Sequence, residues 1–346
     1  MNIPNINFSF FDQKLIHLLD SSFCSNGLSS GRMGYCIYFY QIGRLLNNPT
    51  YESIAEKILS SLLSDLKGQK TLDFSNGLSG IGLGINYLIK KKFVEGNVNQ
   101  ILRDIDDLIF IQLGYPQKSK ELSPLHLIHL LIYLRIRLSD QKNYREQEFL
   151  FRELIIQGIN TLYERINLSF FEEPATITID YTLPLFLYFL GEIYQYNFYN
   201  RRIHEIVSEI SPKVLSSIPT LHSNRLYLLW GMKALYKEIP FKDWANHISL
   251  ISNTLDTSRI LTEELRDRNI FFKDGLTGIY WLADHVKNCL PYQKISILKK
   301  SILEKIVHSD VWKMMNENRY FNGRTGLLDG YCGVSLLLQS TNCQYL

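Results

Sequence analysis

The sequence predicts an all-helical protein in which helix pairs repeat along the chain. A glycine pair, spaced as Gly-x-x-Gly, recurs directly before an apolar run at residues 31–34, 77–80, 275–278 and 330–333. The apolar residues after position 80 recur at a spacing that lines one side of a helix. Gly31 and Gly77 lie 46 residues apart, and Gly275 and Gly330 lie 55 apart. Such intervals are typical of repeat architectures.

Three further segments complete the series without the glycine pair. Residues 123–126, 181–184 and 223–226 each precede an apolar, helix-like run, so we expect seven repeats in all. Glycine at the start of a first helix lets neighbouring backbones come close. This favours closure of the helix pairs into an α/α toroid over an open solenoid. The second helix of each pair carries more charge, as expected of an outer ring that faces water.

The elements follow from this pattern in order. We expect a lead-in helix within residues 1–23, then helix pairs at 34–46 and 51–66, 80–91 and 97–113, 124–138 and 144–165, about 175 onward and 200–217, 226–237 and 241–255, 278–288 and 293–309, and a last helix after residue 333. Asn48 and Pro49 end the first of these helices, and Thr50 can cap the next one. Residues 114–124 are rich in helix breakers and predict a loop. Residues 175–180 alternate β-branched side chains, which indicates a short strand or an extended lead-in.

Composition excludes several classes of protein. The chain has 37 basic and 34 acidic residues and a net charge of +3, so no strong field favours nucleic acid as a partner. The five cysteines are scattered and never form a CxxC pair, which is typical of a protein in a reducing cytosol. We therefore expect a cytoplasmic protein. No secretion signal is recognisable, and the longest apolar runs are too short to span a membrane.

The repeated glycine-rich helix starts, the seven repeats and the closing GLLDGYCGVSLLL of residues 326–338 resemble the LanC-like family, the lanthionine cyclases of ribosomal peptide maturation. The resemblance extends from about residue 31 to residue 338 and is best in repeats one, two, six and seven. It implies one LanC-like domain over residues 1–346, an α/α toroid of about seven inner and seven outer helices. It also implies enzymes that add a cysteine thiol of a precursor peptide to a dehydrated serine or threonine. In that family, a zinc ion held by Cys, Cys and His activates the thiol.

The resemblance does not extend to the metal ligands. Where the family has Cys-His-Gly at the start of repeat six, this chain has Lys273-Asp274-Gly275. The family's other cysteine aligns with residues 221–223, which contain His222, and a further family histidine falls on Asp180. We therefore expect no cofactor, the family zinc included.

Four polar residues at the repeat starts are the candidate catalytic residues: Asp180, His222, Lys273 and Asp274. They would face the same mouth of a toroid, as an acid–base pair or an Asp/His metal site. The alternative is structural: Lys273 and Asp274 form a solvated turn in which Asp274 caps the following helix. His126 and His129 are spaced i, i+3 without a nearby ligand, so we expect them to be packing or solvated residues.

Trp230, Tyr280 and Trp281 are the candidate peptide-binding residues, with burial in the helical core as their alternative. Two hypotheses for the function follow. The chain is a zinc-free member that binds a precursor peptide or a partner maturation enzyme, or it is an active cyclase-like enzyme with an altered Asp/His site. A carboxylate-based, glycan-processing α/α toroid is a third alternative. Whether the protein is an enzyme stays open.

Overall fold

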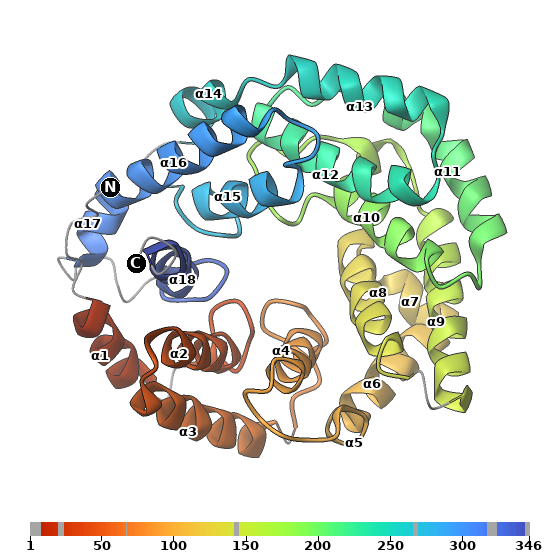
Figure 1. Ribbon diagram of the computed structural model, residues 1–346. Helices are drawn as coiled ribbons and strands as arrows, with labels where there is room; N and C mark the ends of the chain where they lie inside the picture. Colours follow the sequence, from red (N-terminus) through yellow and green to blue (C-terminus); the bar gives the residue numbers. More distant parts are fainter. Residues whose placement is uncertain are drawn as a thin grey trace. The chain divides into compact units, whose positions relative to one another are not determined.

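The computed structural model describes residues 8–19, 24–66, 68–141, 145–265, 269–316 and 324–342. Within these ranges the regular structure is entirely helical, and no strand occurs (Figure 1). Residues 175–180, for which a strand was one of two predictions, are irregular and end in a turn at residues 179–180. The all-helical class predicted from the periodicity of the apolar residues therefore holds for the described residues.

The helices follow the predicted pairs closely. The N-terminal half contains α1 (Phe8–Leu19), α2 (Arg32–Leu46), α3 (Pro49–Asp65), α4 (Leu78–Lys90), α5 (Val98–Ile101), α6 (Arg103–Gly114), α7 (Pro116–Glu121), α8 (Pro124–Leu138) and α9 (Arg145–Tyr163). The remainder contains the 3₁₀ helix η1 (Leu168–Phe171), α10 (Thr182–Tyr194), α11 (Asn200–Leu215), α12 (His222–Glu238), α13 (Lys242–Thr254), α14 (Thr257–Arg259), the π-helix η2 (Ile260–Glu264), α15 (Leu276–His285), α16 (Tyr292–His308), α17 (Asp310–Asn316) and α18 (Tyr331–Asn342).

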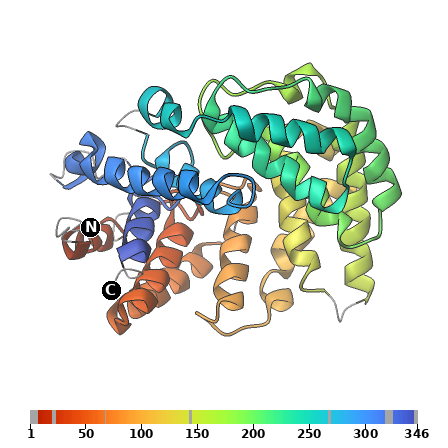
Figure 2. The ribbon, with the colours of Figure 1, turned by 45° about the horizontal axis from the view of Figure 1, so that its top comes forward.

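The chain forms two compact units. The first comprises Met1–Ile105, Leu265–Gly278 and Lys300–Leu346, and the second comprises Asp106–Glu264 and Ile279–Lys299. In the second unit α10 contacts both α8 and α12. Helices α12 and α13, green to teal, also contact each other and lie side by side in Figure 2. The expected single domain over residues 1–346 stays a prediction.

The two helices of a pair differ in burial. In the first pair, α2 has ten buried residues, whereas α3 buries only Ala55, Ile58 and Leu62. In α12 eleven residues are buried, whereas α13 buries only Trp244, His247 and Ile251. A helix that is buried on most sides is a core helix, and one that buries a single stripe faces water on the other side. The predicted difference between first and second helices is confirmed.

The glycine pairs are required because the loop before each first helix folds back over the helix start. A Cβ on the second glycine would lie 1.9–2.4 Å from the carbonyl oxygen six residues earlier, at Gly34, Gly80, Gly278 and Gly333. In the same four loops a backbone N–H donates to the carbonyl seven residues earlier at 2.8–3.0 Å, from Arg32, Leu78, Leu276 and Tyr331. Gly31 and Gly77 have ordinary negative φ angles of −136° and −103°. Glycine is therefore needed for close approach and not for its dihedral freedom.

Two local predictions are wrong. Thr50 does not cap α3; the cap is Asn48, whose side chain accepts a hydrogen bond from the Thr50 N–H at 3.0 Å, while Pro49 begins the helix. Residues 114–124 are not only a loop, because they contain α7. Proline in the first turn of a helix is favourable because its missing N–H has no partner there in any case.

Among the described residues, no helix combines the length and the apolar character needed to cross a membrane.

Candidate functional site

The four predicted polar residues are divided between the two compact units. Asp180 and His222 belong to the second unit, and Lys273 and Asp274 belong to the first. Asp180 precedes α10 and His222 begins α12, so these two residues are positioned by adjacent core helices.

His222 is held at the first turn of α12 and is only 3% exposed. Its Nδ1 accepts a hydrogen bond from the backbone N–H of Asp256 at 3.0 Å. The backbone N–H groups of His222 and Ser223 donate to the two carboxylate oxygens of Glu264 at 2.6 and 2.9 Å. The Glu264 carboxylate thus accepts the hydrogen bonds from the helix start that loop carbonyl oxygens accept in the glycine-paired repeats.

A second carboxylate stabilises the same helix start. Glu173 accepts hydrogen bonds from the backbone N–H groups of Thr220 and Leu221 at 2.6 and 2.8 Å, and from Asn224 Nδ2 at 2.9 Å. Negative charge is favourable at a helix N-terminus, where unpaired N–H groups and the helix dipole are positive. Both carboxylates are therefore engaged as caps of α12.

The hydrogen bond to Nδ1 decides which chemistry His222 can perform. A neutral imidazole whose Nδ1 accepts a hydrogen bond carries its proton on Nε2. Burial lowers the pKa of His222 below its usual value of 6.5, and the positive charge of Arg225 acts in the same direction. His222 is therefore held neutral, with Nε2 as a donor.

These residues do not fit the family zinc. In the structure described, the protonated Nε2 of His222 has no lone pair for a metal, and its Nδ1 lone pair is used by Asp256. Lys273 offers an ammonium group, and the Asp274 carboxylate lies 3.7 Å from the Arg324 guanidinium. Within the described part of the chain, no three His, Cys, Asp or Glu side chains are grouped as metal ligands would be.

Two of the cysteines, Cys36 and Cys332, are poorly suited to replace the family ligands. Cys36 and Cys332 are fully buried, and burial raises the pKa of both thiols. A buried thiol with a raised pKa is a poor source of the thiolate that nucleophiles and zinc ligands require. Cys343 lies outside the described residues.

Asp180 has a partner that the sequence did not identify. Its carboxylate lies 3.6 Å from Nε2 of His129, which is on α8. We expected His129 to be a packing or solvated residue, and the start of α10 brings Asp180 beside it. The i, i+3 histidines of α8 were the available signal, but the partner comes from 51 residues further along the chain.

Two of the three predicted aromatic residues lie in one continuous cluster. Trp230 of α12 stacks on Tyr188 of α10 at a centroid distance of 4.4 Å and on Tyr227 at 5.4 Å. Trp281 of α15 lies edge-on to Trp230 at 5.7 Å and contacts the ring of His285 at 3.9 Å. We call Tyr188, Tyr227, Trp230, Trp281 and His285 the aromatic strip.

The aromatic strip runs from the core to the surface. Trp230 is 8% exposed, whereas Trp281 is 36% exposed. Tyr280, the third predicted residue, is half-buried next to Trp281, with the Lys299 ammonium 4.4 Å from its ring centre. A rigid, partly exposed aromatic surface with a buried foundation is a common kind of peptide-binding surface.

The comparisons with known proteins agree with this architecture. A sequence model of the family described as lanthionine synthetase C-like protein matches residues 22–114. Nisin cyclase matches in structure with a TM-score of 0.67, over 97% of this chain and 94% of its own, at 13% sequence identity. A comparison with curated proteins found no match.

The all-helical structure and the match to nisin cyclase confirm the predicted fold class, an all-α chain with the α/α toroid fold of the LanC-like proteins. The family model at the N-terminal repeats and the shared fold together support the resemblance to the LanC-like family.

Proposed function

We propose that the protein binds a precursor peptide of ribosomal peptide maturation, or a partner enzyme of the same process, in the cytosol and without the family zinc. The observation that supports this function best is the aromatic strip, which presents Trp281 on a stacked foundation of Trp230 and Tyr188. Aromatic residues of this kind supply much of the free energy of peptide binding because they are large and rigid. The nisin cyclase fold adds support, since the name of that protein refers to a peptide product.

The zinc-free part of the proposal is supported by the donor set. His222 presents an N–H group, and Lys273 and Asp274 stand where the family has Cys and His. No step of the proposed function passes through a metal ion.

The test is calorimetric titration of the protein with a panel of precursor peptides rich in Cys, Ser and Thr. We expect Trp281→Ala to weaken peptide binding by at least ~10-fold, as loss of an aromatic anchor does. Tyr292→Ala is the matched control, because Tyr292 is an 83% exposed aromatic residue outside the aromatic strip; it should leave the affinity unchanged. Lack of affinity for every peptide, together with no partner enzyme in a pull-down, would contradict the proposal.

A second candidate function is an active cyclase-like enzyme with an altered site, and the His129–Asp180 pair favours it. A histidine beside a carboxylate is the usual form of a general base. His129 would take the proton from the peptide thiol, sulfur would bond to the β-carbon of the dehydrated residue, and the proton would pass to its α-carbon. The same peptides, dehydrated, distinguish the two candidates: a loss of free thiol that requires His129 and Asp180 favours the enzyme, and an unchanged thiol count favours the binding protein.

A further inference from the structure

A cavity in the first compact unit lies between α1 and α3. Its volume is about 290 Å³. Ile16 and Leu19 line it from α1, and Ile54 and Ile58 line it from α3. Ile58 is buried and the other three are half-buried. The two helices therefore present apolar walls that can hold an apolar group of a ligand.

The two helices are joined next to the cavity by a hydrogen bond. The Tyr51 hydroxyl, near the start of α3, donates to the carboxylate of Asp12 on α1 at 2.7 Å, and the two helices lie side by side in Figure 1. Ile16 follows Asp12 by four residues, and Ile54 follows Tyr51 by three. Residues at these spacings share one face of a helix. The cavity is thus built on the two helix faces that this hydrogen bond fixes.

Two cationic side chains and a hydroxyl complete the lining. They are Arg32 at the start of α2, and Lys57 and Ser61 of α3. The Arg32 side chain is 16% exposed, and its hydrogen bonds to Asp65 and Asn26 both use Nη1. The guanidinium also has N–H donors on Nε and Nη2. Lys57 is exposed and forms no ion pair within the part of the chain that the structure describes.

We propose that this cavity binds a small organic monocarboxylate with an apolar tail. The tail lies between the isoleucines of α1 and α3, and the carboxylate pairs with Arg32 and Lys57. This inference is independent of the proposed peptide binding, because all the lining residues belong to the first unit and the aromatic strip belongs to the second.

The charges and the walls together select this class of ligand. Asp65 neutralises one of the two cations, so a single negative charge completes the balance and a phosphate ester, with nearly two charges, fits less well. The planar guanidinium matches a carboxylate in geometry. An inorganic anion would leave the apolar walls in water, and a neutral ligand would leave the cations without a partner.

The volume sets the length of the tail. At the ~30 Å³ that one water molecule occupies in the liquid, the cavity holds about ten groups of that size. An octanoate ion has about ten non-hydrogen atoms and is therefore the probe of choice.

The first arm of the test is calorimetric titration of the full chain with octanoate and with octan-1-ol, which has the same tail and no charge. We expect saturable binding of octanoate with a Kd of about 1 mM or below, as suits a ligand of this size. Octan-1-ol should bind at least ~5-fold more weakly, because it lacks the charge that Arg32 and Lys57 recognise. Equal affinity for the two ligands, or no saturable binding of octanoate up to ~10 mM, would overturn the proposal.

The second arm locates the ligand by substitution. Ser61→Trp places a large ring in the cavity, and we expect at least ~10-fold weaker octanoate binding. Ser60→Trp is the matched control, since Ser60 is the exposed neighbour on the same helix and does not line the cavity; it should bind as wild type does. Equal binding by these two folded variants, as judged by circular dichroism, would overturn the site.

The third arm tests the charge. Lys57→Met should weaken octanoate binding ~3-fold or more, whereas Lys213→Met, at an exposed lysine of α11 in the second unit, should not. Unchanged binding by Lys57→Met would overturn the assigned carboxylate contact. Trp281→Ala should leave octanoate binding intact even though it weakens peptide binding, so failure of either proposal is recognised separately. Loss of octanoate binding in Trp281→Ala would assign the ligand to the aromatic strip and overturn the cavity site.

Discussion

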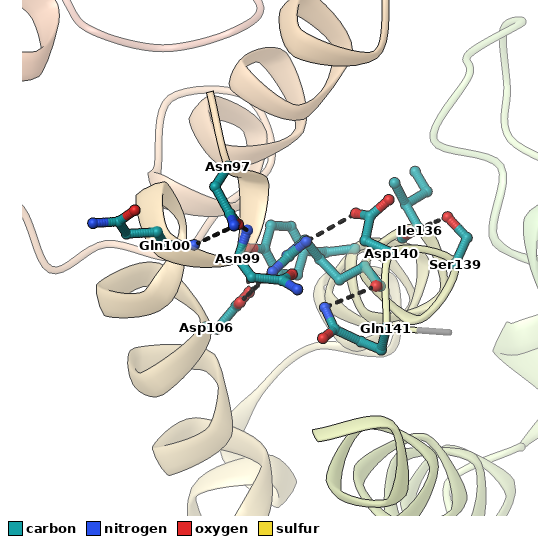
Figure 3. A network of polar contacts seen from close by, with 10 residues as sticks. Asn97, Asn99, Gln100, Asp106, Ile136, Ser139, Asp140 and Gln141 are labelled. Carbon is teal, nitrogen blue, oxygen red and sulfur yellow. Dashed lines mark hydrogen bonds and ion pairs between the residues drawn. The ribbon is translucent and has the colours of Figure 1, made fainter. Parts of the chain in front are cut away.

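At the scale of single residues, Arg137 shows how much of the core depends on one buried charge. Arg137 is 1% exposed, and its guanidinium donates to both oxygens of Asp106 and, at 2.8 Å, to Asp140. Gln141 donates to the Arg137 carbonyl at 3.3 Å, and this network is seen around Asp106 and Asp140 in Figure 3. Tyr133 also donates its hydroxyl to Asp106 at 2.7 Å, but the guanidinium supplies the opposite charge that a buried carboxylate needs.

We expect Arg137→Met to lower the free energy of unfolding by about 3–5 kcal/mol, because it leaves the buried Asp106 carboxylate without an opposite charge. Urea denaturation followed by circular dichroism measures this change. Arg201→Met is the control: its side chain is 95% exposed and pairs with Glu205 at the surface, so the midpoint should not move. A loss below ~1 kcal/mol for Arg137→Met would show that water reaches Asp106.

His222 illustrates what a sequence can and cannot say about a residue. Its place at a repeat start marked it as a candidate, and the structure puts it in a buried polar site. The protonation of its ring depends on the Asp256 N–H, 34 residues away in sequence. No local pattern around His222 encodes that contact.

At the scale of elements, the glycine-paired loop before a core helix is the structural feature that recurs along the chain. In four repeats the loop backbone lies against the helix start so closely that no Cβ fits on the second glycine. At α12 the helix N–H groups donate to side chains and not to loop carbonyls, because the carboxylates of Glu173 and Glu264 accept their hydrogen bonds. The start of α8 is likewise capped by a side chain, because Ser123 Oγ accepts from the His126 N–H at 3.2 Å.

Gly80→Ala is the sharpest test of this close approach between loop and helix start. Its Cβ would lie 1.9 Å from the Phe74 carbonyl oxygen, so the loop must move, and we expect a loss of roughly 3 kcal/mol, the upper part of the range for overpacking. Thermal and urea unfolding measure it. Gly114→Ala is the control, since its Cβ would meet only Leu154 at an ordinary 3.8 Å. Equal stability of the two variants would contradict the role assigned to the glycine pair.

At the scale of the whole molecule, the match in structure covers far more of the chain than the match in sequence does. The family model covers residues 22–114, whereas the match to nisin cyclase covers 97% of the chain at 13% identity. The matched segment contains two of the glycine pairs, at 31–34 and 77–80. Repeats three to five, which lack the pairs, lie outside the matched segment, which ends at Gly114.

The metal content of the whole protein tests the zinc-free proposal. We expect elemental analysis of the purified protein to find well below one zinc per chain, in wild type and in His222→Ala alike. The physical reason is that neither nitrogen of His222 has a lone pair free for a metal. About one zinc per chain in wild type that is lost in His222→Ala would contradict the proposal and favour the enzyme with an altered site.

The sequence by itself determined the helical class, the repeat order and most helix positions, because glycine spacing and apolar periodicity are local properties. It also identified Trp230 and Trp281 as candidates. Only the tertiary structure decided the partners: His129 beside Asp180, the Asp256 N–H on His222 Nδ1, the carboxylate caps of α12 and the stacking of Tyr188 on Trp230. Each of these contacts joins residues more than 30 positions apart, and such contacts form only when separate helices pack, so no local pattern in the sequence specifies them.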